Sequence, residues 1–121
     1  MFSSEIKKFF KGEVLTDSAT LEKYSEDASI FKIRPEVVVF PKDVEDIKNL
    51  VKFVAAKKKK DKKISISPRA AGTDMTGGPL TESIVLEFTR HFHQIKEIRM
   101  SGPAGGSAIV EPGVYYRHFE K

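Results

Sequence analysis

The chain has 121 residues, which is enough for about one domain with a single hydrophobic core. Hydrophobic residues make up 40% and charged residues 31%, a composition typical of a globular protein and not of a disordered tail. The absence of cysteine excludes disulfides, thiolate metal sites and thiol nucleophiles, while the net charge of +4 is mild.

The sequence also predicts no membrane segment and no secretory signal. It contains no run of about 18 apolar residues, the length that a membrane span needs. The residues that follow Met1 lack a continuous apolar stretch and a small-residue cleavage site. We therefore expect a cytoplasmic location.

The first forty residues predict two short helical stretches and a buried strand. Apolar residues recur at helical spacing before Gly12, and Leu21 follows Thr16 and Asp17, either of which can cap a second helical turn. The run Val37-Val38-Val39-Phe40 is apolar at every position, which is typical of a strand covered on both faces.

The next segment predicts a βαβ unit. Asp43 can cap an amphipathic helix that ends near Lys57, and residues 64–67 alternate as a strand does. A strand, a helix and a second strand within about thirty residues predict two parallel strands with a right-handed crossover.

The C-terminal third predicts more strands. Residues 84–88 form the third, 95–100 the fourth and 108–110 the fifth, and the last two read as an antiparallel hairpin. Residues 114–121 have the pattern of a helix start. The predicted class is α+β, a small parallel βαβ sheet flanked by helices (1–80) followed by the start of an antiparallel sheet (81–121).

Two polar features have both a structural and a functional interpretation. The lysine run 57–63 is typical of a solvated helix end, and a nucleic-acid patch is the less favoured alternative because no aromatic residues interleave it. His91 and His93 have the spacing of a metal pair, but no carboxylate pair lies near them, so we expect loop histidines and no metal.

The segment 68–79, between the second and third predicted strands, is the candidate site. It is long and rich in glycine and hydroxyl groups, and it starts at the carboxyl end of a strand, where open α/β sheets bind ligands. Glycines permit a positive φ and let successive N–H groups converge on an anion. A diphosphate is the expected ligand. The pattern is neither a P-loop, because Gly78-Pro79 replaces Lys-Ser/Thr, nor a dinucleotide fingerprint, and a plain connecting loop is the alternative.

The sequence Pro68-Arg69-Ala70-Ala71-Gly72-Thr73-Asp74-Met75-Thr76-Gly77-Gly78 resembles the first FAD-diphosphate loop of the FAD-linked oxidases. These are flavoproteins of the p-cresol methylhydroxylase and vanillyl-alcohol oxidase fold, and the most similar branch holds glycolate oxidase subunits and D-lactate dehydrogenases. The segments 24–29, 35–54, 83–90 and 110–114 resemble this family in the same order. The resemblance covers nearly the whole chain and implies the N-terminal part of such a FAD-binding domain.

The resemblance also implies the site residues. Pro68 and Arg69 would shape the start of the loop, and Pro112 and Gly113 would lie along the flavin's extended chain. The FAD diphosphate would be surrounded by Ala70, Ala71, Gly72, Thr73, Asp74, Thr76, Gly77 and Gly78. Thr73 stands where covalent members have His, so FAD is expected to bind non-covalently. Asp74 stands where a small hydroxyl residue is frequent, and beside a diphosphate it must point away or accept from its own loop.

The predicted function is the FAD-binding portion of a flavin-dependent oxidoreductase acting on a 2-hydroxy acid such as lactate or glycolate. The family's substrate domain and catalytic base have no counterpart here, so we assign no catalytic residue and expect a fragment without activity alone. The expected partners are FAD, the remainder of the enzyme or a complementing chain, and a second copy of the chain. The alternatives are a small basic nucleic-acid-binding module and an interaction module.

Overall fold

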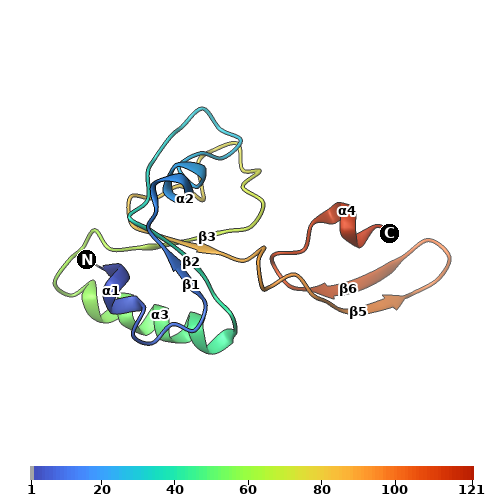
Figure 1. Ribbon diagram of the computed structural model, residues 1–121. Coiled ribbons are helices and arrows are strands. Elements are labelled where there is room, and N and C mark those ends of the chain that lie inside the picture. Colours follow the sequence, from blue (N-terminus) through green and yellow to red (C-terminus); the bar gives the residue numbers. More distant parts are fainter. Residues whose placement is uncertain (1) are drawn as a thin grey trace.

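The computed structural model describes residues 2–121 and shows a four-stranded sheet followed by a separate two-stranded sheet (Figure 1). The elements in chain order are α1 (Phe2–Ile6), β1 (Glu13–Leu15), α2 (Ser18–Lys23), β2 (Val37–Phe40), α3 (Val44–Lys57), β3 (Ile66–Arg69), β4 (Ile84–Glu87), β5 (Ile95–Met100), β6 (Gly106–Val110) and α4 (Tyr116–Phe119).

Both predicted helix caps are present. The Asp17 carboxylate accepts a hydrogen bond from the main-chain N–H of Thr20 and begins α2. The Asp43 carboxylate accepts from the N–H of Asp46 and begins α3. Each bond satisfies an N–H group that a helix start would otherwise leave without a partner.

The first sheet has the strand order β1-β2-β4-β3. The two strands of the predicted βαβ unit, β2 and β3, both run parallel to β4, which lies between them. Pro68 explains why β3 is an edge strand, because proline has no N–H to donate to a second neighbour. The antiparallel edge strand β1, paired with β2, was not predicted; three residues are too few to carry a periodic signal.

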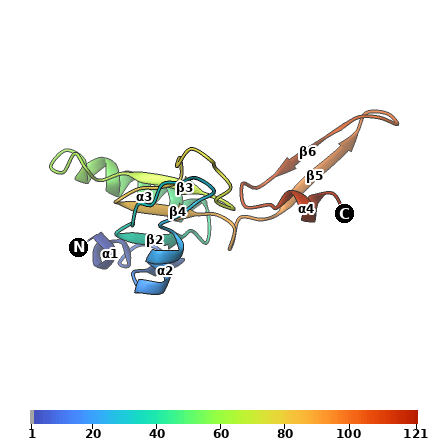
Figure 2. The ribbon, with the colours of Figure 1, turned by 90° about the horizontal axis from the view of Figure 1, so that it is seen from above.

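Helices cover both faces of this sheet: α2 lies above the strands in Figure 1, α1 and α3 lie below them, and Figure 2 shows the molecule from above. On one face, Ile6 of α1 and Leu50 and Val54 of α3 pack against alternate residues of β2 and β4. On the other face, Leu21 of α2 and Tyr24 pack against the intervening residues, including Phe40. The buried run 37–40 is therefore apolar at every position because both of its faces are covered.

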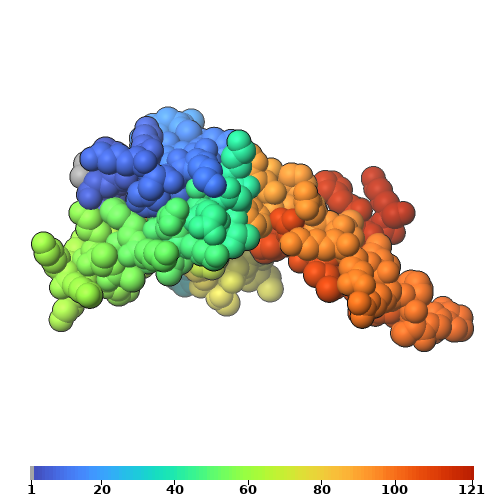
Figure 3. All heavy atoms as spheres, turned by 90° about the horizontal axis from the view of Figure 1, so that it is seen from below, coloured from blue at the N-terminus to red at the C-terminus, as the bar shows by residue number. Residues whose placement is uncertain are grey.

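The predicted antiparallel hairpin is confirmed as β5 and β6, and the predicted C-terminal helical turn is α4. The hairpin extends away from the first sheet (Figure 3). Because β4 is an inner strand of the first sheet, the structure joins the two sheets through residues 88–94, so a division after residue 80 would separate β4 from its neighbours. No helix within residues 2–121 is long and apolar enough to cross a membrane.

Candidate functional site

The end of β3 and the segment that follows it border an open hollow of about 430 Å³. The hollow lies at the carboxyl end of β3, which is parallel to its neighbour β4. Its lining consists of Pro68, Arg69, Ala70, Ala71, Gly72, Thr73, Asp74, Gly78 and Pro79. The structure thus brings most of the predicted loop residues around one cavity.

The backbone of the loop turns through left-handed glycines. Gly72 has φ of +72° and Gly77 has φ of +81°, a region that other residues adopt at a cost. Within residues 2–121, no protein group accepts a hydrogen bond from the main-chain N–H of Ala71, Gly72 or Thr73. Three successive residues that line the hollow therefore have main-chain N–H groups without a protein acceptor, and such groups are the donors that anion-binding loops use.

Asp74 holds the second half of the loop together. Its Oδ1 accepts hydrogen bonds from the hydroxyl and from the main-chain N–H of Thr76, both at 2.6 Å. The Thr76 hydroxyl and N–H hold the pKa of Asp74 below its usual range, and the N–H of Gly78 adds to this effect. The Asp74 carboxylate therefore accepts hydrogen bonds from its own loop, which is the second of the two arrangements that the sequence allowed, and it occupies the hydroxyl and N–H donors of Thr76.

Arg69 is fixed by residues far away in the chain. Its Nη1 donates to the main-chain oxygen of Glu26 at 2.7 Å, and its guanidinium carbon lies 5.0 Å from the centre of the Tyr24 ring. The sequence placed Arg69 at the start of the loop but gave no sign of these partners.

The segment 24–31 packs against the loop and forms a hydrogen bond with it. The N–H of Ala28 donates to the main-chain oxygen of Asp74 at 3.1 Å. The Phe31 ring would lie 3.1 Å from a Cβ atom at Gly77, so it packs directly against that turn. Together with the bond from Arg69 to Glu26, these contacts join the stretch after α2 to both the start and the second half of the loop. Only the resemblance to the family had singled this stretch out.

Pro112 and Gly113 do not line the hollow. The N–H of Gly113 donates to the main-chain oxygen of Phe92 at 2.6 Å, and its Cα packs against the main chain of Phe88. The N–H of Phe88 in turn donates to the main-chain oxygen of Arg69 at 3.0 Å. The 112–113 turn and the start of the loop therefore both contact the main chain of Phe88, which follows the carboxyl end of β4.

Comparison with known proteins identifies the cofactor. A profile of the FAD binding domain matches residues 35–121, which is more than half of the chain. The chain belongs to this FAD-binding family. FAD is therefore the cofactor of this domain, and the available amides around the hollow fit an anionic group such as its diphosphate.

Relatives of this FAD-binding chain are much longer proteins. D-2-hydroxyglutarate dehydrogenase of Pseudomonas putida is 31% identical over 91 residues, which are 75% of this chain and 9% of the relative. Glycolate oxidase subunit GlcD of Escherichia coli is 30% identical over 101 residues, 82% of this chain and 18% of the relative. The chain thus spans less than a fifth of the length of these curated relatives.

Solved structures show the same fold. An alkyldihydroxyacetonephosphate synthase matches with a TM-score of 0.71 at 17% identity, over 98% of this chain and 23% of the other. The mixed sheet with its helices is therefore the fold expected from the family resemblance, and the FAD-binding domain of this chain is one part of a larger architecture in such proteins.

The remaining sequence candidates lie away from the hollow. His91 Nε2 lies 2.7 Å from Glu13 Oε2, whereas His93 Nδ1 lies 3.0 Å from the main-chain oxygen of Thr89, so the two histidines have different partners. Within residues 2–121 no metal-ligating group of three such residues forms. The lysine run begins at Lys57, the last residue of α3, whose side chain pairs with Glu5 at 2.7 Å. The comparisons give no support to a nucleic-acid function.

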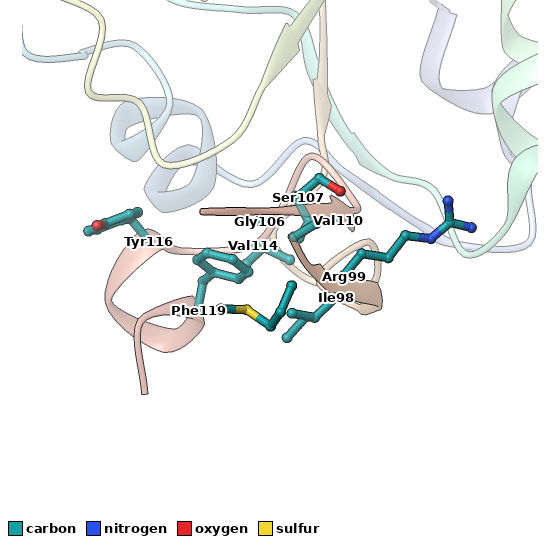
Figure 4. A pocket seen from close by; sticks show the side chains of 10 residues that line it. Ile98, Arg99, Gly106, Ser107, Val110, Val114, Tyr116 and Phe119 are labelled. Carbon is teal, nitrogen blue, oxygen red and sulfur yellow. The ribbon is translucent and has the colours of Figure 1, made fainter. Parts of the chain in front are cut away.

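A second, larger hollow lies against the hairpin (Figure 4). It measures about 530 Å³ and is bounded by one face of the hairpin and by Val114, Tyr116 and Phe119. The apolar hairpin residues are exposed: Ile98 by 59% and Met100 by 74%. This apolar face contrasts with the polar loop hollow and is unlike a diphosphate site.

Proposed function

We propose that the loop 68–78 binds the diphosphate of FAD, and that it does so without a covalent bond. The observation that carries the proposal is the hollow bordered by the unpaired N–H groups of Ala71, Gly72 and Thr73, at a left-handed glycine turn. Thr73 offers no imidazole for attachment to the flavin. Pro112 and Gly113, beside Phe88, are proposed to contact the extended part of the cofactor.

We propose further that the whole protein oxidises a 2-hydroxy acid of the lactate or glycolate type. The names of the relatives, D-2-hydroxyglutarate dehydrogenase and glycolate oxidase subunit, support this substrate class. The flavin, once bound, supplies the acceptor for the electrons of such an oxidation. The residues of this chain bind and orient it, and we assign the substrate contacts to other parts of the protein or to a complementing chain.

The exposed hairpin supports the assignment of the substrate contacts to polypeptide outside this chain. The match covers 98% of this chain but only 23% of the solved alkyldihydroxyacetonephosphate synthase, which is therefore about four times as long. We propose that further polypeptide of the same protein packs on the apolar hairpin face and completes the second sheet. A cytoplasmic location stays a prediction.

The test is a titration of the purified chain with FAD, followed by flavin fluorescence and visible absorbance. Competition with ADP and with adenosine separates the contribution of the diphosphate from that of the adenine, and we expect only ADP to compete well. Acid precipitation should release all of the flavin into the supernatant if no covalent bond forms. Failure of FAD to bind both this chain and a longer protein that contains it would refute the proposal.

A further inference from the structure

Arg69 carries the one charge that the sequence places at the start of the diphosphate loop, yet the structure ties it to the protein. Its Nη1 donates to the main-chain oxygen of Glu26 at 2.7 Å. Its planar guanidinium also lies over the Tyr24 ring, with 5.0 Å between the Arg69 Cζ atom and the ring centre. Both partners precede Arg69 by more than forty residues.

The guanidinium also supports the backbone of the loop. A Cβ atom at Gly72 would lie only 2.8 Å from Arg69 Cζ, so the main chain of Gly72 rests directly on the guanidinium. Gly72 is the left-handed residue that separates the amides of Ala71 and Thr73. The guanidinium therefore contacts the turn that sets the direction of these amides.

The support extends down to the core. Tyr24 is 9% exposed and packs edge-on against Phe40 of β2, with ring centres 5.9 Å apart. Phe40, Tyr24, Arg69 and Gly72 thus form a column that runs from a central strand to the loop. Rigid support of this kind holds a binding loop in its bound geometry before the ligand arrives.

We propose that Arg69 is a positioning residue of the FAD site, which presents the amides of the loop through its stack on Tyr24 and does not act as the main phosphate ligand. The identity of the ligand rests on the proposed function, whereas the support of the loop by Arg69 does not. The two roles differ in what they require: a phosphate ligand needs a positive charge, and the column needs a planar guanidinium.

The experiment compares Arg69→Lys, which keeps the charge, with Arg69→Gln, which removes it. Tyr24→Leu removes the aromatic support, and Tyr24→Phe keeps the ring. Arg117→Gln, at an exposed position of α4, is the matched control for loss of one positive charge. Hydrogen exchange of the peptide that covers residues 70–78 is measured without FAD, and the dissociation constant for FAD is measured separately.

We expect Arg69→Lys and Arg69→Gln to raise the exchange of residues 70–78 alike and to weaken FAD binding by a similar factor, about tenfold. Tyr24→Leu should reproduce both effects, whereas Tyr24→Phe should behave like the wild type. Because Tyr24 is buried, the thermal unfolding of its variants is measured in parallel. If Tyr24→Leu does not fold, the comparison of Arg69→Lys with Arg69→Gln decides the test.

A different result would overturn the proposal. If Arg69→Lys keeps the wild-type affinity, Arg69→Gln loses it, and loop exchange is unchanged in both, Arg69 contacts the phosphate directly. If the wild-type protein binds no FAD, the proposed function fails, but the exchange of residues 70–78 still shows whether Arg69 supports the loop. Unchanged exchange in both Arg69 variants would then refute the support.

Discussion

At the residue scale, Gly72 is the position where the backbone geometry of the site can be tested most directly. Alanine at φ of +72° costs about 1–2 kcal/mol, and its Cβ would also overlap the Arg69 guanidinium. We therefore expect Gly72→Ala to weaken FAD binding by about tenfold or more, measured by flavin fluorescence titration.

Gly102→Ala is the matched control for that substitution. Gly102 also has a positive φ, of +132°, but a Cβ atom there would have no other atom within 4 Å, and the residue belongs to the hairpin turn. Gly102→Ala should leave the affinity for FAD unchanged. Equal affinities of Gly72→Ala and the wild type would show that the loop turn does not shape the site.

The residues of the loop differ in how far their roles could be predicted. Asp74 and Thr76 are two positions apart, so their hydrogen bonds are a local matter that the sequence could anticipate. The partners of Arg69 are 43 and 45 residues away and meet it only through the packing of α2 on the sheet. The local sequence pattern therefore predicted a glycine-rich binding loop. The tertiary fold determined which hydrogen-bond donors of the loop already have a protein partner and which remain available to a ligand.

At the scale of elements, the strands that the sequence predicted best are those with the most continuous apolar runs. β2 and β4 are buried at every position, and their residues were predicted almost to the boundary. β3 begins two residues later than predicted, because Ile64 packs into the core before the strand starts and Pro68 lies within it. The strand order could not be predicted from the local sequence pattern, because it depends on which strands can form main-chain hydrogen bonds with a neighbouring strand on both sides.

Asp46 provides a stability prediction at this scale. Its buried carboxylate accepts hydrogen bonds from the main-chain N–H of Lys11 at 2.8 Å and of Gly12 and Lys42, each at 2.9 Å. Asp46→Ala would leave these donors without a partner, so we expect a loss of about 3 kcal/mol or more of unfolding free energy in urea. Asp61→Ala, an exposed change that removes one hydrogen bond, should cost under about 1 kcal/mol. Similar losses for the two variants would contradict this account.

Glu13 gives a prediction on pH. Burial alone would raise its pKa, but the His91 hydrogen bond and its own main-chain N–H outweigh this and hold the pKa of Glu13 below its usual range. A lowered pKa means that the stabilisation is present above the ordinary value of about 4.3 and is lost as pH falls through the folded-state pKa. We expect the wild type to have a higher melting temperature than Glu13→Gln at a pH of about 6, and we expect this difference to narrow as the pH falls below about 4. A difference in melting temperature that stays constant over this range would contradict the prediction.

At the scale of the whole molecule, the two sheets are covered to very different degrees. The first sheet has helices on both faces, whereas every residue of β6 is exposed. An isolated two-stranded sheet is marginally stable in water and has two unpaired edges. Composition and periodicity predicted the hairpin, but they did not predict that every residue of β6 would be exposed. Only the family resemblance implied this exposed surface.

The apolar hairpin face leads to a prediction on association. When the chain is studied by itself, the second copy is the surface available to cover Ile98 and Met100, because apolar patches and unpaired strand edges favour self-pairing. We expect concentration-dependent association in sedimentation velocity, and the double substitution Ile98→Glu with Met100→Glu should abolish it. The control is Ile30→Glu, which replaces an isoleucine that is 95% exposed and lies outside the hairpin. It adds the same negative charge as each of the two hairpin substitutions, and it should leave the association intact. Because neither hairpin residue lines the loop hollow, FAD binding should survive the double substitution, and a monomeric wild-type chain at high concentration would refute the prediction.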